Sequence, residues 1–269
     1  MKDDFIIAPP SDPLLLPWVD TYFYLDIPVT DLSLAEEHVF PFPRITFGYF
    51  FDHPFAVTNH STGQSGTADM VFSKIATQQV SVKPLTMRVK IVGAHLKPFA
   101  LALLTQTDVG ALPWLIDAHD LLSQHAVRLR GALDQCSTPE AMFSELERTF
   151  KAAMGSRNLE AVTRAIELIE RHGGSMTVSA VAGQVGTSTR TLRNHFSRTI
   201  GCSPKAYSLL VKLRQSVYQM RYASDSLTAV SYDQNFADQA HFTRTVKHII
   251  GTPPHDIRRQ LPNFRFLQF

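Results

Sequence analysis

Short hydrophobic runs separated by prolines make up most of residues 1–110. The runs at 45–51, 80–82 and 87–92 are rich in β-branched and aromatic residues, as strands are, whereas 59–66 has the composition of a loop. Proline breaks a helix because it lacks the backbone N–H and clashes with the preceding turn. The prolines that recur here are Pro9, Pro10, Pro13, Pro17, Pro28, Pro41, Pro43 and Pro54. We therefore expect a β-rich N-terminal region.

The hydrophobic period changes to that of helices from about residue 113. Apolar side chains follow a 3.6-residue stripe over 114–131 and again over 138–153, where Thr138 is the expected cap in front of Pro139. The two stripes predict either a dimer contact or a cover for the β-rich region. Residues 154–158 end the second helix, so we place a linker there and divide the chain into residues 1–154 and 155–269.

The remaining chain has a helical pattern almost throughout and contains an internal repeat. An amphipathic helix over 159–172 ends at Gly173-Gly174. Residues 178–186 then match 227–235 at an offset of 49, which becomes 50 after the turn. The matched pairs are Ala180 with Ala229, Val181 with Val230, Leu192 with Phe242, Phe196 with Val246, Ile200 with Ile250, Gly201 with Gly251 and Pro204 with Pro254. A repeat of this period predicts two copies of one supersecondary unit.

Each copy has a short helix, a tight turn and a longer helix. In the first copy Gly186 can adopt the positive φ of a sharp turn, and Ser188 can cap the next helix. In the second copy Asn235 tolerates the same geometry, and Asp238 is the cap. This is the layout of a helix-turn-helix motif, whose second helix enters the major groove of DNA.

One longer helix, from residue 203 to about Ala223, is expected to join the two copies. Its apolar stripe consists of Ala206, Leu210, Leu213, Val217 and Met220. Arg214 near its middle is placed to pair with either an acidic side chain or a phosphate, and the pattern leaves both open.

Helix geometry, at about 100° per residue, separates the buried face of each second helix from its exposed face. The buried faces consist of Leu192, Phe196 and Ile200 in the first copy and Phe242, Val246, Ile249 and Ile250 in the second. The exposed positions that we predict to contact DNA are Arg190, Arg193, Asn194 and Arg198, then Gln239, Ala240, His241 and Arg244. Arginine recognises guanine, amides recognise adenine and small apolar groups contact the thymine methyl, so these residue types suit base reading.

Charge strengthens this interpretation once it is divided along the chain. The net charge is +2, but residues 1–156 hold 11 Lys and Arg against 17 Asp and Glu, a balance of −6. Residues 157–269 hold 15 against 7, a balance of +8. A basic region attached to an acidic one favours binding of the phosphate backbone by the basic part.

Residues 159–260 resemble the DNA-binding domain of the AraC/XylS family of transcription regulators. The resemblance rests on the two motifs above and on Gly201-Cys-Ser-Pro204 and Gly251-Thr-Pro-Pro254, which follow them. It implies seven helices with two recognition helices in successive major grooves on one face of the DNA. The family's base-contacting positions correspond to Arg190, Arg193, Asn194, Gln239, Ala240, His241 and Arg244. Departures are Ser231, Asn235, Val246 and Ile257, where alanine, glycine, phenylalanine and tyrosine are usual.

The N-terminal half resembles, more loosely, the domains that precede such DNA-binding domains and sense a small effector or drive dimerisation. We expect an α+β protein: a β-rich N-terminal domain with trailing helices, then an all-α domain with two helix-turn-helix motifs. Its expected partner is double-stranded DNA with an asymmetric site. Further expected partners are a small-molecule effector, RNA polymerase and a second copy in a homodimer.

An enzyme, or an interaction protein with an appended helix-turn-helix domain, is the alternative. We expect no catalytic residues, cofactor or metal, because the two cysteines have no metal-ligand or redox spacing and His53, His60 and His95 form no His-x-His pair. The pattern contains no run of 18 apolar residues and no secretory signal at its start, which predicts a cytoplasmic protein without a membrane span.

Overall fold

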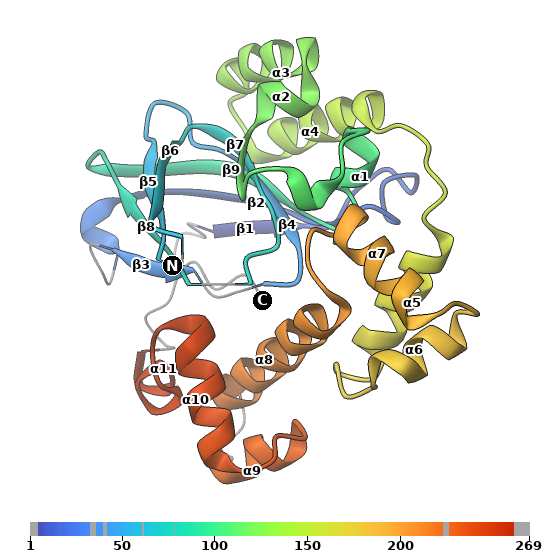
Figure 1. The fold of residues 1–269 in the computed structure, drawn as a ribbon. Helices are drawn as coiled ribbons and strands as arrows, with labels where there is room; N and C mark the ends of the chain where they lie inside the picture. Colours follow the sequence, from blue (N-terminus) through green and yellow to red (C-terminus); the bar gives the residue numbers. More distant parts are fainter. Residues whose placement is uncertain are drawn as a thin grey trace.

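A computed structural model describes residues 5–32, 36–39, 42–60, 62–77, 79–222 and 226–260. The chain folds into a β-rich region, covered on one side by helices α1 to α4, and a helical region from α5 to α11 (Figure 1). The expected α+β architecture, with an N-terminal β-rich part and an all-α C-terminal part, is confirmed. No helix among the described residues is both long and apolar enough to cross a membrane.

Two antiparallel sheets build the N-terminal region. The six-stranded sheet runs in the order β1 (Phe5–Ala8), β2 (Val19–Pro28), β9 (Arg88–Leu96), β4 (Ile45–Tyr49), β7 (Met70–Ser73) and β10 (Leu115–Asp117). The four-stranded sheet runs in the order β3 (Glu37–Val39), β8 (Val80–Pro84), β5 (Phe55–Asn59) and β6 (Gln64–Ala68). The three runs that predicted strands at 45–51, 80–82 and 87–92 overlap β4, β8 and β9, and residues 50, 51 and 87 lie outside these strands.

The loop expected over 59–66 is shorter than its composition predicted. Asn59 ends β5 and Gln64 begins β6, so the two strands form a hairpin in which Gly63 has a φ of +68°. Four of the five residues of β6 are exposed. A polar strand at a sheet edge has the same composition as a loop, and for this reason the composition predicted a loop over the whole segment.

The helix expected over 114–131 is wrong in its first part. Residues 115–117 form β10, which pairs with β7, and the helical part is divided into α2 (Ala118–Leu122) and α3 (Gln124–Gln135). Ser123 between the two helices has a φ of +49°, which no helix can include. Strand pairing with β7 therefore overrides the local helical period at Leu115 and Ile116.

Helix α4 (Pro139–Ala153) begins as expected, with the Thr138 hydroxyl accepting a hydrogen bond from the Ala141 N–H. The apolar residues of α3 and α4 are buried within this single chain, among them Leu129, Leu133 and Phe150. Of the two interpretations of these stripes, the structure supports the cover over the β-rich region. Short helical turns complete this part of the chain: η1 (Val29–Asp31), α1 (Leu101–Leu104) and η2 (Val109–Ala111).

Seven helices follow in the described part of the C-terminal region, the number that the family resemblance implied. They are α5 (Glu160–Arg171), α6 (Val178–Gln184), α7 (Thr189–Thr199), α8 (Pro204–Tyr222), α9 (Leu227–Asp233), α10 (Gln239–Ile250) and α11 (Pro254–Gln260). Residues 154–159, between α4 and α5, have no regular structure, and the division into two domains there stays a prediction. The expected end of the connecting helix, Ala223, lies outside the described residues.

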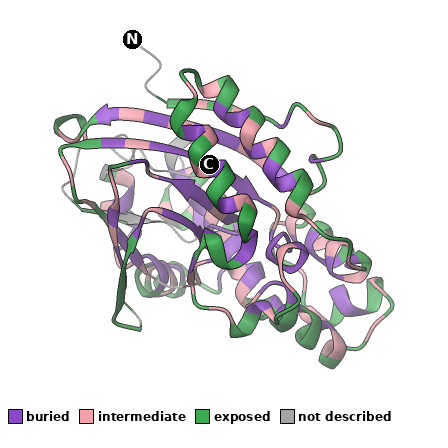
Figure 2. Cartoon of the chain, turned by 90° about the horizontal axis from the view of Figure 1, so that it is seen from above, coloured by how far each residue is buried: buried purple, intermediate pink, exposed green. Residues whose placement is uncertain are grey.

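The hydrophobic core is continuous from the β-rich region into the helical region. One cluster of buried side chains extends from Leu15 and Phe47 through Phe150 to Phe196 and Phe242. Figure 2 shows buried positions along the strands and on the inner faces of the helices, with exposed positions on their outer faces. A second, smaller cluster lies between the two sheets and includes Phe23, Phe55 and Val57.

Candidate nucleic-acid interface and effector cavity

The first helix-turn-helix motif consists of α6 and α7. The Thr177 hydroxyl caps α6, the turn passes through Gly186 at a φ of +72°, and the Ser188 hydroxyl accepts the Thr191 N–H to begin α7. Leu192 and Phe196 are fully buried, as the helical wheel predicted. Packing of this face fixes α7 so that its opposite face points away from the core.

The second motif repeats these devices with different residues. Ser226 caps α9, Asn235 adopts a φ of +53° in the turn, and the Asp238 carboxylate accepts the His241 N–H at the start of α10. Phe242 and Val246 are fully buried, and Gly251 ends the helix in the left-handed conformation. The departures from the family pattern keep the packing, since Val246, Ser231 and Ile257 are all buried.

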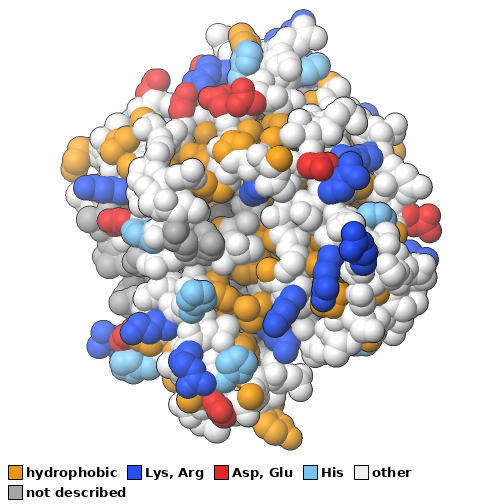
Figure 3. Space-filling view, in the orientation of Figure 1, with side chains coloured by type: hydrophobic (Ala, Val, Ile, Leu, Met, Phe, Trp, Pro, Cys, Tyr) orange, Lys and Arg blue, Asp and Glu red, His pale blue; other side chains and the backbone are white. Residues whose placement is uncertain are grey.

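Every position predicted to contact DNA lies on an exposed face. On α7 these are Arg190, Arg193, Asn194 and Arg198, and on α10 they are Gln239, Ala240, His241 and Arg244. Figure 3 shows Lys and Arg side chains over α7 and α8, and Lys, Arg and His side chains over α10 and α11. These residues can present the charged and hydrogen-bonding groups that duplex DNA requires. Their contacts with DNA stay a prediction.

Three of these side chains already have partners in the chain. Arg198 forms an ion pair with Asp108 of the β-rich region, with 3.0 Å between Nε and Oδ1. Gln239 accepts a hydrogen bond from the Thr228 hydroxyl at 2.7 Å. The His241 ring lies edge-on to the Phe236 ring, with 5.6 Å between the ring centroids. These three side chains must change partners to reach DNA, whereas the structure gives Arg190, Arg193 and Asn194 no such constraint among the described residues.

The connecting helix α8 buries its predicted stripe from Leu210 to Met220 and contacts both α7 and α9. The contact that the structure shows for Arg214 on this helix is with an aromatic ring. Its guanidinium lies over the Phe42 ring, 4.8 Å from the centroid. Burial, followed by the charge of Arg44, lowers the pKa of Arg214 from its usual value. The pattern of α8 could not show this contact, because Phe42 comes from another part of the chain.

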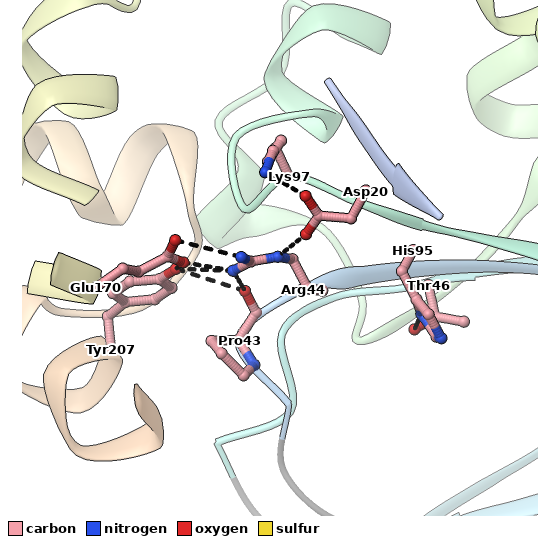
Figure 4. A network of polar contacts seen from close by, with 8 residues as sticks. All are labelled: Asp20, Pro43, Arg44, Thr46, His95, Lys97, Glu170 and Tyr207. Atoms are coloured by element: carbon pink, nitrogen blue, oxygen red, sulfur yellow. Dashed lines mark hydrogen bonds and ion pairs between the residues drawn. The ribbon is translucent and has the colours of Figure 1, made fainter. Parts of the chain in front are cut away.

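A buried ion cluster joins the two regions of the molecule (Figure 4). Arg44, only 7% exposed, forms ion pairs with Asp20 of β2 and with Glu170 of α5. Lys97 holds the second oxygen of Asp20, and the Tyr207 hydroxyl of α8 donates to Glu170 at 2.5 Å. Burial alone would raise the pKa of Asp20, but the neighbouring cations Arg44 and Lys97 outweigh it and lower that pKa.

A cavity of about 490 Å³ lies between the two sheets. Its walls are mainly apolar, with Phe23 and Ile91 from one sheet and Phe55 and Val57 from the other. The polar residues that line it are Arg44, Thr46, Asn59, Thr62, Gln64, Ser73, Lys74, Thr77 and His95. Gly201, two residues after the end of α7, is also part of the wall, so the cavity reaches the helical C-terminal region.

His95 and Lys74 are titratable groups in the cavity wall whose burial changes their pKa. His95 is almost completely buried between Phe23 and Phe42, its Nδ1 lies 3.3 Å from the Thr46 hydroxyl, and burial holds its pKa at about 3. Lys74 donates hydrogen bonds to the carbonyls of Leu112 at 2.8 Å and Gly110 at 3.5 Å. Burial lowers the pKa of Lys74. The histidine is therefore neutral, while the lysine is a half-buried cation bonded to backbone groups.

The sequence pattern gave no sign of this cavity or of the ion cluster. Each of the three histidines named in the sequence analysis contacts a hydroxyl group: His53 that of Thr86, His60 that of Ser81 and His95 that of Thr46. Nothing in the spacing of Lys74 or Arg44 marks them, because their partners are far away in the chain. The alternation of residues in β4 and β7 could have indicated that Thr46 shares a face with Gly48, and Ser73 with Val71, and that this face lines the cavity.

Comparisons with known proteins agree with this geometry. A family model described as a helix-turn-helix domain matches residues 181–260. The chain is 28% identical over 173 residues to the HTH-type transcriptional activator RhaS of Escherichia fergusonii, a match that covers 58% of this chain and 62% of that protein. It is 30% identical over 81 residues to RhaS of Yersinia pestis, covering 30% of each. The chain thus matches less than two thirds of the length of these relatives.

The whole fold is similar to that of ToxT from Vibrio cholerae, with a TM-score of 0.53 at 11% identity, covering 98% of this chain and all of that one. ToxT with a bound unsaturated fatty acid gives a TM-score of 0.51 at 12% identity, covering 94% of both chains. This likeness concerns the fold, including the arrangement of a β-rich region before the helices. The family model and the paired motifs show that the C-terminal region of this chain is a helix-turn-helix domain, as the resemblance to the AraC/XylS family led us to expect.

Proposed function

We propose that this protein is a sequence-specific transcription regulator whose α7 and α10 read successive major grooves of DNA. The observation that carries the proposal is the pair of capped helix-turn-helix motifs, joined by α8, whose exposed faces are polar and basic. A recognition helix places the residues near its N-terminus against the bases. Arg190, Arg193 and Asn194 have this position in α7, and Gln239 to Arg244 have it in α10.

The two recognition helices carry different side chains, so the DNA site should be asymmetric. A single chain would read two unlike half-sites about one helical turn apart, roughly 10–10.5 bp between their centres. Arg198 and Lys247, farther along the two helices, are placed for phosphates. RhaS, the relative with 28% identity, is named as a transcriptional activator, which supports regulation as the role. Contact with RNA polymerase and formation of a homodimer belong to the same proposal.

Selection of bound DNA from a random pool, followed by insertion of base pairs into the selected site, tests the proposal. About 5 bp inserted between the half-sites turns the second groove to the opposite face, since a full turn takes about 10 bp. We expect fluorescence anisotropy to show affinity falling to that of one motif plus nonspecific phosphate contacts. The matched control is a 5 bp insertion outside the two half-sites, which lengthens the DNA by the same amount and leaves their spacing unchanged. Unchanged affinity with 5 bp between the half-sites would contradict paired reading, and no selected site at all would favour the enzyme or interaction-protein alternative.

We also propose that the cavity between the sheets binds a small effector. Binding sites for small molecules are concave and mainly apolar with a few placed polar groups, and this cavity has that composition. Its aromatic walls fit an apolar body, and Lys74 fits an anionic group. A crystal structure of ToxT, whose fold is similar, contains a bound unsaturated fatty acid, which joins an apolar chain to an anionic end.

The probe 1-anilinonaphthalene-8-sulfonate, which joins an aromatic body to an anion, tests the cavity. We expect enhanced probe fluorescence that Val57→Trp abolishes by filling the cavity and Lys74→Met weakens. The matched control is Val127→Trp, which adds the same side chain at a position on α3 that is 64% exposed. Equal fluorescence with Val57→Trp and Val127→Trp would place the probe outside the cavity.

A further inference from the structure

The β-rich region touches the first recognition helix at one defined place. The turn η2 and the residues around it, 108–112, pack against the C-terminal half of α7. Val109 is fully buried, and a Cβ built on Gly110 would lie only 2.7 Å from the Ser197 carbonyl oxygen. The Asp108 carboxylate pairs with Arg198. We call residues 108–112 the η2 segment.

The η2 segment lies on the side of α7 that is proposed to face DNA. Ser197 follows Asn194 by three residues and Arg190 by seven, so the three share one face of the helix. Arg198 follows Asn194 by four residues and therefore lies one turn farther along. Asp108 thus occupies the position beside Arg198 that a DNA phosphate would take, and its negative charge repels that phosphate.

The same segment is bonded to the wall of the cavity. Lys74, at the end of β7, donates to the carbonyls of Gly110 and Leu112, and both the lysine and Gly201 line the cavity. Among the described residues, backbone carbonyls are the hydrogen-bond partners of this amine, and no carboxylate pairs with it. An anionic group that entered the cavity would attract the ammonium more strongly than the neutral carbonyls do, because two opposite charges attract each other strongly in a partly buried site.

We propose that the η2 segment is a brake on DNA binding by α7, and that an anionic ligand in the cavity releases it by withdrawing the Lys74 amine. The proposal rests on the function proposed above for α7. In the braked state Arg198 is paired with Asp108, and Gly110 lies against the Ser197 carbonyl in the C-terminal half of the helix. In the released state the η2 segment moves away, and Arg198 becomes available to a phosphate.

Three substitutions in the full-length chain weaken the brake by independent routes. Asp108→Asn removes the ion pair, Lys74→Met removes the two hydrogen bonds, and Gly110→Ala introduces a methyl group against Ser197. Gly110 is outside the left-handed region, so alanine strains the contact and not the backbone. The matched control is Gly131→Ala on α3, where an added Cβ meets nothing within 4 Å.

We expect each of the three variants to bind the selected DNA site more tightly than the wild type, while Gly131→Ala binds like the wild type. An exposed ion pair is weak, so Asp108→Asn should raise affinity about two- to fivefold, and less at high salt. Hydrogen exchange should speed up at the amides of Ala111 and Leu112, which donate within the segment. Thermal denaturation of each variant establishes that it is folded.

The outcomes separate the brake from the proposed function. Wild-type affinity in all three folded variants, or weaker binding in them than in Gly131→Ala, would overturn the brake while leaving DNA binding intact. Failure of every protein to bind any selected DNA would overturn both proposals. If Asp108→Asn and Gly110→Ala bind DNA more tightly but Lys74→Met binds like the wild type, the brake is supported and its coupling to the cavity is contradicted.

Discussion

Single side chains in this protein carry charge states that the fold itself sets. His95 lies between two phenylalanine rings in the cavity wall, and its burial keeps it neutral at pH values at which an exposed histidine is protonated. Arg190 and Asn194, in contrast, are exposed on α7, and we propose that they contact DNA.

The stability of the protein should decrease on acidification because of His95. Its pKa of about 3 in the folded chain is below the ordinary value of 6.5, so between these values the unfolded chain binds a proton that the folded chain does not. Stability is then present above pH 6.5 and is lost as the pH falls toward 3. We expect a loss of about 2 kcal/mol between pH 7 and pH 5, measured by urea unfolding. His95→Gln should reduce that loss, whereas His119→Gln, at an exposed histidine, should not.

Base reading by α7 should depend on Arg190 and Asn194. Each replaced by alanine should weaken binding to the specific site by about 1–3 kcal/mol and relax base preference there, because a side chain that contacts a base edge discriminates by this amount. Anisotropy titrations with matched and mismatched DNA measure both effects. Arg171→Ala, on the exposed side of α5, is the control for loss of charge alone. Unchanged binding by both variants would rule out α7 as the reader of the first groove.

At the scale of the elements, local capping and turn residues determine where the helices of the two helix-turn-helix motifs begin and end. Thr177, Ser188, Ser226 and Asp238 each accept a backbone N–H at the start of a helix. Gly186 and Asn235 supply the left-handed turns between the helices of each motif. Because these devices are local, the pattern of residues predicted the motifs and their buried faces closely.

The glycines of the first motif give a matched pair of stability tests. Gly186→Ala should destabilise the protein by about 1–2 kcal/mol, because a Cβ is unfavourable at its φ of +72°. Gly183→Ala, three residues earlier inside α6, should stabilise it by about 0.5–1 kcal/mol, since alanine is the better helix former. Neither added Cβ would meet another atom within 4 Å. Equal changes in the free energy of unfolding would contradict a backbone origin.

The elements that the pattern predicted poorly depend on partners distant in the chain. Residues 115–117 pair with β7 although their period is helical, and the polar strand β6 is held by β5. At the candidate site, the exposed faces of α7 and α10 followed from helix geometry. The Arg198–Asp108 pair joins residues 90 apart, and Arg44 meets Glu170 across 126 residues. No local rule of period or capping reports such contacts.

At the scale of the whole molecule, the ion cluster around Arg44 fastens the β-rich region to α5 and α8. Removal of Arg44 would leave Asp20 and Glu170 without their shared cation in a partly buried site. Fully buried pairs lose about 3–5 kcal/mol when one partner is removed. These carboxylates keep 23% and 30% exposure and Lys97 still holds Asp20, so a smaller effect is expected here.

Arg44→Met should therefore destabilise the full-length protein by about 2–3 kcal/mol, as measured by chemical denaturation. Limited proteolysis should also cut the chain faster between α4 and α5 once the two regions separate more readily. The matched control is Arg148→Met, whose ion pair with Glu145 lies on the surface and should contribute at most about 1 kcal/mol. Equal losses in the two variants would show that the cluster does not hold the regions together.

The ion cluster also limits how this protein can change in evolution and in the laboratory. Recombination that joined α5–α11 to a foreign N-terminal half would leave the Glu170 carboxylate and the Tyr207 hydroxyl without Arg44. Joining this N-terminal half to a foreign C-terminal half would leave Arg44 as a buried cation without Glu170 and Tyr207. Recombination that exchanges one half of the chain is therefore disfavoured in evolution, unless the residues on both sides of the cluster are inherited together. A chimaeric regulator built from this chain should transfer Arg44, Glu170 and Tyr207 as one unit.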